Sequence, residues 1–180
     1  MLTILIGKTS SGKTTIADIL ESKYEYKKII TYTSRPPRKG EIDGYTYHFV
    51  TDEEFHKKIS AGFFLEYKRY TVADGSVWYY GSPKEEFYSD KDSIIILTPD
   101  GYEDFLKFDI PHKSIYIYAN NETIKKRLIM RGDDKAEAQR RIEHDNEDFK
   151  GLQYKVDYIV YNNDGENIDD VVNKILDKIR

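Results

Sequence analysis

Apolar residues recur along the chain in short runs that alternate with helical patterns. The runs that resemble buried strands are residues 2–6, 29–32, 93–97, 114–118 and 158–161. Apolar positions at helical spacing occur in residues 13–22, 102–108, 122–131, 135–149 and 168–179. Alternation of strands and helices along a chain predicts an α/β fold with a mainly parallel sheet and helices on both of its faces.

The segment between residues 33 and 82 shows a different pattern. Aromatic residues alternate between positions 45 and 49 as in a strand, and Thr-x-x-Glu at 51–54 is a capping box that starts a helix ending near residue 59. Asp74-Gly75 stands between two strand-like segments and favours a hairpin turn. We therefore expect an inserted, partly β lobe.

Composition narrows the class of protein. A chain of 180 residues is long enough for one domain with a sizeable core. Its formal net charge of -4 argues against nucleic-acid or anionic-membrane binding, and the absence of cysteine suits a reducing compartment. The apolar run at 2–6 is too short for a signal peptide or a membrane span. We expect a soluble cytoplasmic protein, a monomer or weak homodimer, that binds neither nucleic acid nor membranes.

The first chemical motif is GKTSSGKT, residues 7–14, which fits G-x-x-x-x-G-K-[ST] and lies between a predicted strand and a predicted helix. Successive backbone N–H groups and the start of the helix can enclose a phosphate, which Lys13 also reaches, while Thr14 offers a hydroxyl to Mg²⁺. The flanking elements make a chance glycine-rich turn a poor alternative. We expect an ATP site formed by Gly7, Ser10, Ser11, Gly12, Lys13, Thr14 and Thr15.

A second basic cluster follows at TSRPPRKGE, where Arg35, Arg38 and Lys39 surround two prolines in an otherwise acidic chain. Guanidinium groups on a stiffened loop can bond phosphate oxygens in pairs, and Tyr47 on the following strand can add a hydroxyl donor. Taken alone, an Arg/Pro loop is more often a solvated surface turn. The neighbouring motifs decide between the two interpretations.

Those neighbours resemble the guanylate kinase family. The resemblance rests on TSRPPRKGEIDGYTYHFVTDEEFHKKISAGFFLEY followed by YYGSP, on the P-loop, on RLIMRGDD at the entry to the family's lid, and on DYIVYNND at its last strand. It covers nearly the whole chain. It implies a P-loop three-layer α/β fold with a single domain divided into a core (1–32, 83–126, 150–180), a monophosphate-binding lobe (33–82) and a short helical lid (127–149).

The resemblance also implies roles for individual residues. The family's GMP site corresponds here to Thr31, Arg35, Arg38, Tyr47, Glu66, Tyr80 and Ser82. Its catalytic cations correspond to Lys13, Arg35, Arg127, Arg131 and Arg141. Asn162 matches a position near the adenine of ATP, although Asn and Gly in YNNDG also favour a plain turn.

Guanine chemistry supports the assignment of Glu66 and Ser82. Guanine presents the N1–H and N2–H₂ donors beside the O6 acceptor, so one carboxylate can accept both donors while a hydroxyl donates to O6. Adenine lacks the N1 proton, and its binding would leave a buried carboxylate short of a donor at a cost of roughly 1–3 kcal/mol or more. Without the family context, Glu66 would be an ordinary surface acid.

The chain departs from the family at two places. Arg127 and Arg131 lie four apart on one predicted helix face. The spacing from Arg131 to the next arginine pair is about one residue shorter than the family pattern, so either Arg140 or Arg141 takes the lid position. The family also shows Asp-x-Asp after the strand 93–97, where this chain has LTPDGYED. Asp100 and Thr98 are the candidates to replace those acids.

The expected function is ATP-dependent, Mg²⁺-assisted transfer of a phosphoryl group to GMP or dGMP, giving ADP and GDP or dGDP. The alternatives are a kinase for another nucleotide or a phosphorylated sugar, and a non-catalytic guanylate-kinase-like module that binds a protein partner. Lys13 and Thr14 favour an enzyme, since a binding module has no use for them.

Overall fold

The computed structural model describes residues 1–38, 40–71 and 75–180, which build two sheets. The central sheet has five strands in the order β2-β7-β1-β8-β9, and every neighbouring pair is parallel. These strands are β1 (Leu2–Ile6), β2 (Lys27–Lys28), β7 (Ser93–Ile96), β8 (His112–Tyr118) and β9 (Tyr158–Tyr161). The predicted α/β class with a mainly parallel sheet is confirmed.

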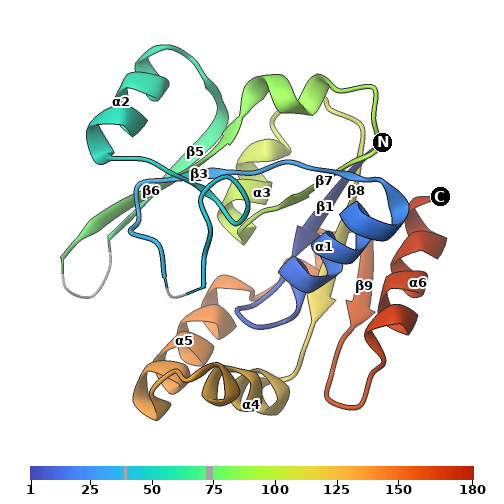
Figure 1. Cartoon of the computed structure of the whole chain (residues 1–180). Coiled ribbons are helices and arrows are strands. Elements are labelled where there is room, and N and C mark those ends of the chain that lie inside the picture. Colours follow the sequence, from blue (N-terminus) through green and yellow to red (C-terminus); the bar gives the residue numbers. More distant parts are fainter. Residues whose placement is uncertain (39, 72–74) are drawn as a thin grey trace.

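Helices cover both faces of the central sheet (Figure 1). One face carries α1 (Lys13–Tyr24) and α6 (Ile168–Ile179), whose apolar side chains pack on β1, β7 and β8. The other carries α3 (Pro99–Phe105) and the segment after α5 (Lys135–Asp148), including the 3₁₀ turn η2 (Leu152–Tyr154). All five residues of β1 are buried, as expected for a central strand covered on both sides.

The lobe contains the second sheet, with strand order β4-β3-β6-β5. Its strands are β3 (Tyr32–Thr33), β4 (His48–Phe49), β5 (Phe64–Thr71) and β6 (Val77–Pro83). β5 and β6 pair antiparallel from Phe64 to Thr71, while Asp74 of the predicted Asp74-Gly75 turn lies outside the described residues. The predicted capping box is present at Thr51 and Glu54, and it starts α2 (Asp52–Ser60).

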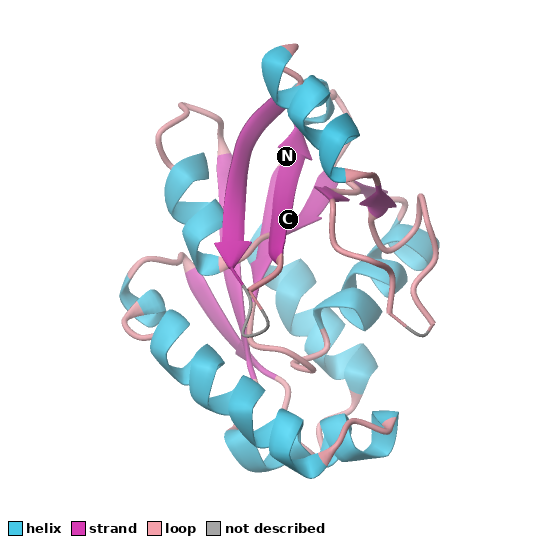
Figure 2. Cartoon of the chain, turned by 90° about the vertical axis from the view of Figure 1, so that its left-hand side faces the viewer, coloured by secondary structure: helices cyan, strands magenta, loops and turns pink. Residues whose placement is uncertain are grey.

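Two helices lie below the lobe in the view of Figure 1. α4 (Asn121–Arg131) and α5 pack through a small apolar cluster that includes Ile124, Leu128 and Ile142. Figure 2 faces the lobe and shows its long strands above these helices. No helix in the described part of the chain is long and apolar enough to cross a membrane.

Three local predictions differ from the structure. The strand-like segment 45–49 forms a strand only at His48–Phe49, because the Tyr45 N–H bonds to the Ile42 carbonyl in a turn. The expected strand at 29–32 is divided between the sheets, because Ile29 donates its N–H to Ile94 of the central sheet whereas the Thr31 carbonyl accepts from His48 of the lobe. The helix expected at 102–108 begins earlier, at Pro99. The Thr98 side chain accepts from the Gly101 N–H and caps the helix, and proline suits the first helical position. The 3₁₀ helix η1 (Lys84–Tyr88) was not predicted.

Candidate active site

The loop between β1 and α1 depends on two glycines. Gly12 has φ 100°, a left-handed conformation that L side chains rarely adopt, and it stands immediately before the first residue of α1. A Cβ on Gly12 would lie 2.3 Å from Asn162 Nδ2, and one on Gly7 would lie 2.6 Å from the Ile117 carbonyl oxygen. Neither position tolerates a side chain without displacement of its neighbours.

Two polar side chains hold this loop from outside. The buried Asn162 donates from Nδ2 to the Ser11 carbonyl at 2.8 Å. Arg127 donates to the Ser10 carbonyl at 3.2 Å and to the Asn162 carbonyl at 3.0 Å. The structure thus places Arg127 and Asn162 on the backbone of the loop, where they orient its peptide groups.

Gly12→Ala is expected to lower the free energy of unfolding by about 2–4 kcal/mol, because it combines an unfavourable φ with a clash against Asn162. Gly132→Ala is the matched control. Gly132 has φ 94°, but a Cβ there meets nothing within 4 Å. Urea unfolding should therefore show a loss of only about 1 kcal/mol for the control. Equal losses in the two variants would mean that the Asn162 contact contributes nothing.

Lys13 lies where three cavities meet. It lines a cavity of about 560 Å³ beside the loop, called here the P-loop cavity. It also lines the lobe cavity of about 230 Å³, which extends toward β5 and β6, and the middle cavity of about 200 Å³ between them. Its Nζ donates to the carbonyls of Gly7 at 2.6 Å and Lys8 at 2.8 Å. Burial lowers the pKa of Lys13 to about 8.

The residues expected to bind ATP gather around the P-loop cavity. Its lining includes Ser10, Gly12, Lys13, Thr14, Thr15, Arg127, Arg131 and Asn162. Thr14 and Thr15 are exposed at the start of α1, whereas Ser11 is fully buried within the loop. Gly7 lines the lobe cavity instead.

Glu66 and Ser82 form the inner end of the lobe cavity. They face one another across β5 and β6, and the Ser82 hydroxyl donates to Glu66 Oε1. Glu66 is only 8% exposed, and desolvation raises the pKa of its carboxyl to about 7 despite this hydrogen bond. Because the Ser82 hydrogen is already used, a donor bond from Ser82 to a ligand requires the hydroxyl to turn away from Glu66.

Arg35 is buried, 3% exposed, and fully engaged. Its guanidinium makes two parallel bonds to Glu41, at 2.9 and 2.8 Å, and donates from Nε to the Tyr80 hydroxyl at 3.1 Å. Tyr47 stacks edge-on against Tyr80, and burial raises its pKa to about 12. Tyr47 and Tyr80 line the lobe cavity, so Arg35 supports this wall from behind.

Arg38 lines the middle cavity together with Thr31, Lys13 and Arg131. Desolvation lowers its pKa, and the positive charges of Arg35 and Arg141 lower it further. Several cations therefore converge on this space, as expected of a site for a polyanion. Lys39, the third member of the basic cluster, lies outside the described residues.

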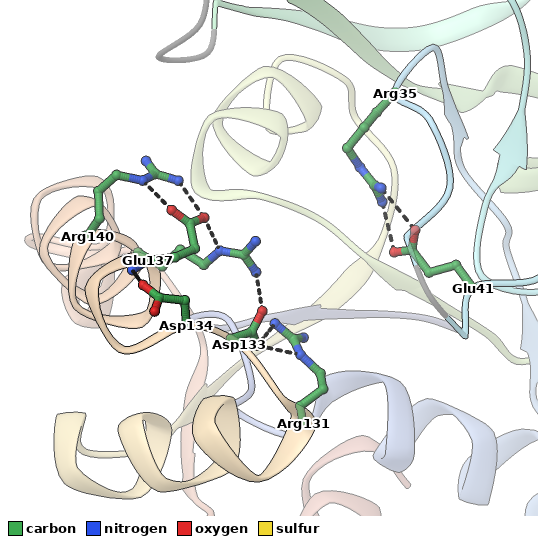
Figure 3. A network of polar contacts seen from close by, with 8 residues as sticks. Arg35, Glu41, Arg131, Asp133, Asp134, Glu137 and Arg140 are labelled. Carbon is green, nitrogen blue, oxygen red and sulfur yellow. Dashed lines mark hydrogen bonds and ion pairs between the residues drawn. The ribbon is translucent and has the colours of Figure 1, made fainter.

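Three further arginines, Arg131 of α4 and Arg140 and Arg141 of α5, are held by acids (Figure 3). Arg131 donates to Asp133 at 2.8 Å, and Arg141 donates to Glu137 at 2.7 Å. Arg140 also binds Glu137, but its side chain is 54% exposed against 19% for Arg141. The positive charge of Arg141 helps to lower the pKa of Arg38 in the lobe.

The two residues expected to replace the missing Asp-x-Asp acids, Thr98 and Asp100, both line the lobe cavity. Thr98 lines the lobe cavity, but its hydroxyl caps α3 and lies 3.1 Å from the Tyr70 hydroxyl. Asp100 is in the first turn of α3 and lines the same cavity. The structure thus brings both residues to the wall opposite β5, close to Glu66.

Sequence reasoning missed several residues of this site, among them Lys68, Tyr70 and Asp145. Lys68 and Tyr70 follow Glu66 at alternate positions of β5, and like Glu66 they line the lobe cavity. Lys68 pairs with Asp104 at 2.8 Å, which connects the lobe to α3. The period of two along the strand was the available signal. Asp145 of α5 also lines the cavity, and no local pattern marked it.

Comparison with known proteins identifies relatives over the full length of the chain. A family model described as "Guanylate kinase" matches residues 1–179. Guanylate kinase of Wolbachia pipientis wMel is 32% identical over 188 residues, which span 100% of this chain and 90% of the relative. Guanylate kinase of Helicobacter pylori (strain ATCC 700392 / 26695) is 34% identical over 179 residues, 95% of this chain and 84% of the relative.

A solved structure supports the fold. The crystal structure of guanylate kinase from Anaplasma phagocytophilum superposes with a TM-score of 0.70 at 22% identity, covering 99% of this chain and 83% of that protein. The two chains share the same architecture.

Proposed function

The chain belongs to the guanylate kinase family and is a nucleoside monophosphate kinase, and we propose that it transfers the γ-phosphoryl group of ATP to GMP or dGMP with Mg²⁺. The products are ADP and GDP or dGDP. Residues 33–82 and 127–149 then act as the acceptor lobe and the lid on one core.

One observation supports the proposal most directly, namely the position of Lys13 where the P-loop, middle and lobe cavities meet. A triphosphate on the loop and an acceptor phosphate near Arg38 would approach each other beside this ammonium group. Phosphoryl transfer needs little covalent help from the protein, so positioning and charge stabilisation supply most of the rate.

The donor side uses the loop amides, Lys13 and the residues of the P-loop cavity to hold ATP. Arg127 and Asn162 keep the loop in shape, and the adenine contact expected for Asn162 is an additional role. Arg131 and Arg141 bind the transferring group when the lid closes, exchanging Asp133 and Glu137 for phosphate oxygens.

Magnesium fits the donor set without a dedicated cage. No group of three or more His, Cys, Asp or Glu residues able to hold a metal occurs in the described part of the chain. Mg²⁺ keeps several waters and takes few protein ligands, so the exposed Thr14 hydroxyl together with nucleotide oxygens suits it. When bound, it neutralises charge on the β- and γ-phosphate oxygens.

The acceptor side recognises phosphate and base at opposite ends. Thr31, Arg38, Tyr47 and Tyr80 take the phosphate, and Arg35 joins them if the phosphate replaces Glu41 as its partner. Glu66 accepts from guanine N1–H and N2–H₂, and Ser82 turns to donate to O6. Asp100 or Thr98 supplies further contacts on the opposite wall.

The proposal is tested by a coupled assay of ADP release with GMP, dGMP, AMP, CMP, UMP, dTMP and sugar phosphates as acceptors. We expect kcat/KM for the guanine nucleotides to exceed that for AMP by a factor of at least roughly 10–100. This factor corresponds to the free-energy cost of leaving one or two buried polar groups without a hydrogen-bond partner when AMP binds. Turnover confined to other acceptors would overturn the substrate assignment. Absence of turnover with every acceptor would favour a binding module.

A further inference from the structure

Helix α5 touches the P-loop at two consecutive residues. Asp145 Oδ2 accepts a hydrogen bond from the Thr9 backbone N–H at 2.6 Å. The next residue, Asn146, accepts a hydrogen bond from the Lys8 ammonium group. The loop is therefore fastened on this side by an acid that lies 136 positions away in the sequence.

Asp145 is also a counter-charge for Lys13. Both residues line the lobe cavity, and the two hydrogen bonds of the Lys13 ammonium group end on neutral carbonyl oxygens. Burial lowers the pKa of Lys13, and the negative charge of Asp145 opposes that shift. Asp145 likewise opposes the lowering of the Lys8 pKa by burial.

Other charged groups share the cavities that Lys13 lines. Helix α4 contributes Arg127 and Arg131, the lobe contributes Arg38 and Lys68, and β2 contributes Lys28, all of which disfavour a further positive charge. The acids there, besides Asp145, are Glu41 in the lobe, Glu66 on β5, Asp100 on α3, Asp148 on α5 and Glu166 before α6. Asp145 is distinguished from these acids by its direct bond to the loop that carries Lys13.

We propose that Asp145 is a positioning residue for phosphoryl transfer, which holds the P-loop through Thr9 and keeps Lys13 protonated before ATP arrives. The phosphates of ATP then become the counter-charge of Lys13. The inference rests on the proposed function, because it assigns the loop to ATP. It adds a residue that sets the loop conformation and the charge of Lys13 before ATP binds.

The test compares wild type with Asp145→Asn, which keeps an acceptor for Thr9 but removes the charge. The measured quantity is kcat/KM for ATP between pH 6 and 9.5, which reports the free enzyme. The wild-type profile should fall above about pH 8, where Lys13 loses its proton. Loss of a nearby opposite charge should move this fall to lower pH by roughly one unit.

At pH 9 the variant should therefore lie roughly tenfold below wild type, and at pH 6.5 within about twofold. Glu147→Gln is the matched control, since it exchanges an exposed acid for its amide on the same helix and should leave the profile unchanged. Asp145→Glu keeps the charge and should retain a profile close to wild type. Thermal melts of each variant report whether it folds.

Equilibrium binding of ADP over the same pH range gives a second readout that needs no catalysis. A failure of the wild type to phosphorylate GMP would overturn the proposed function, whereas the binding comparison would still test Asp145. An unmoved profile in Asp145→Asn would overturn the inference, as would an equal displacement in Asp145→Glu. Tighter ADP binding by Asp145→Asn at every pH would also overturn it, because the carboxylate would then compete with phosphate.

Discussion

Lys13→Met is expected to lower kcat by roughly 10²–10³-fold or more, because it removes a preorganised positive charge from the place where negative charge develops. The same change should leave the protein as stable as wild type or more stable. The folded state lowers the pKa of Lys13 to about 8 from 10.5, so at neutral pH the protein bears the cost of burying the charged form. Methionine fills a similar volume without that cost.

Steady-state kinetics at saturating ATP and GMP measure the first effect, and thermal melts at pH 7 measure the second. Lys23→Met on the same helix is the control, since Lys23 is exposed and pairs with Asp169 on the surface. Its kcat should match wild type. A Lys13→Met variant that loses stability together with activity would indicate damage to the loop and would contradict the electrostatic role.

Glu66→Gln is expected to lower kcat/KM for GMP by roughly 10²–10³-fold, because two hydrogen bonds to a charged group are lost or weakened, each worth about 1.5–3 kcal/mol. The Gln amide would also point donor hydrogens at the N1–H or N2–H₂ donors of guanine. The ratio of kcat/KM for GMP over AMP should fall as well, since an amide offers the donor and acceptor that adenine requires.

The pH dependence of kcat/KM for GMP distinguishes recognition of guanine by the Glu66 carboxylate from a purely structural role of Glu66. The pKa of Glu66 is raised to about 7 from 4.5, and guanine needs the ionised form. In the wild type, kcat/KM for GMP should therefore fall as the pH decreases through about 7. The Gln variant cannot ionise, so its profile should lack this fall. A variant that keeps the same acid limb would show that another group is responsible for it.

The chemistry of the P-loop was predictable because it depends on neighbours in the chain. A glycine at position 12 permits the left-handed turn, and Lys13 and Thr14 follow it at the start of a helix. The capping box of Thr51 and Glu54 and the helix 168–179 were predicted for the same reason. Each needs only hydrogen bonds or apolar spacing within a few residues.

Other features were not predictable because they depend on which side chains the folded backbone brings together, whether those side chains are near or far in the chain. The bond from Ser82 to Glu66 restricts the hydroxyl that was expected to face the base. The pairing of Arg35 with Glu41 neutralises a cation that was expected to be available for phosphate. The different exposure of Arg140 and Arg141, 54% and 19% of their side chains, also depends on the packing of α5 in the fold and not on their spacing in the sequence.

Three features could be read from the sequence alone, namely the α/β class, the P-loop and the order of motifs by which the chain resembles guanylate kinases. Short-range backbone geometry and the pattern of apolar residues encode these features, so they can be identified without coordinates. Which polar and charged groups meet, in contrast, became known only from the folded chain. Thr9 contacts Asp145, and Ser11 contacts Asn162, because folding brings the loop against helix α5 and the end of β9. Such pairs set protonation and loop shape through distances of a few ångströms, which separation along the chain does not reveal.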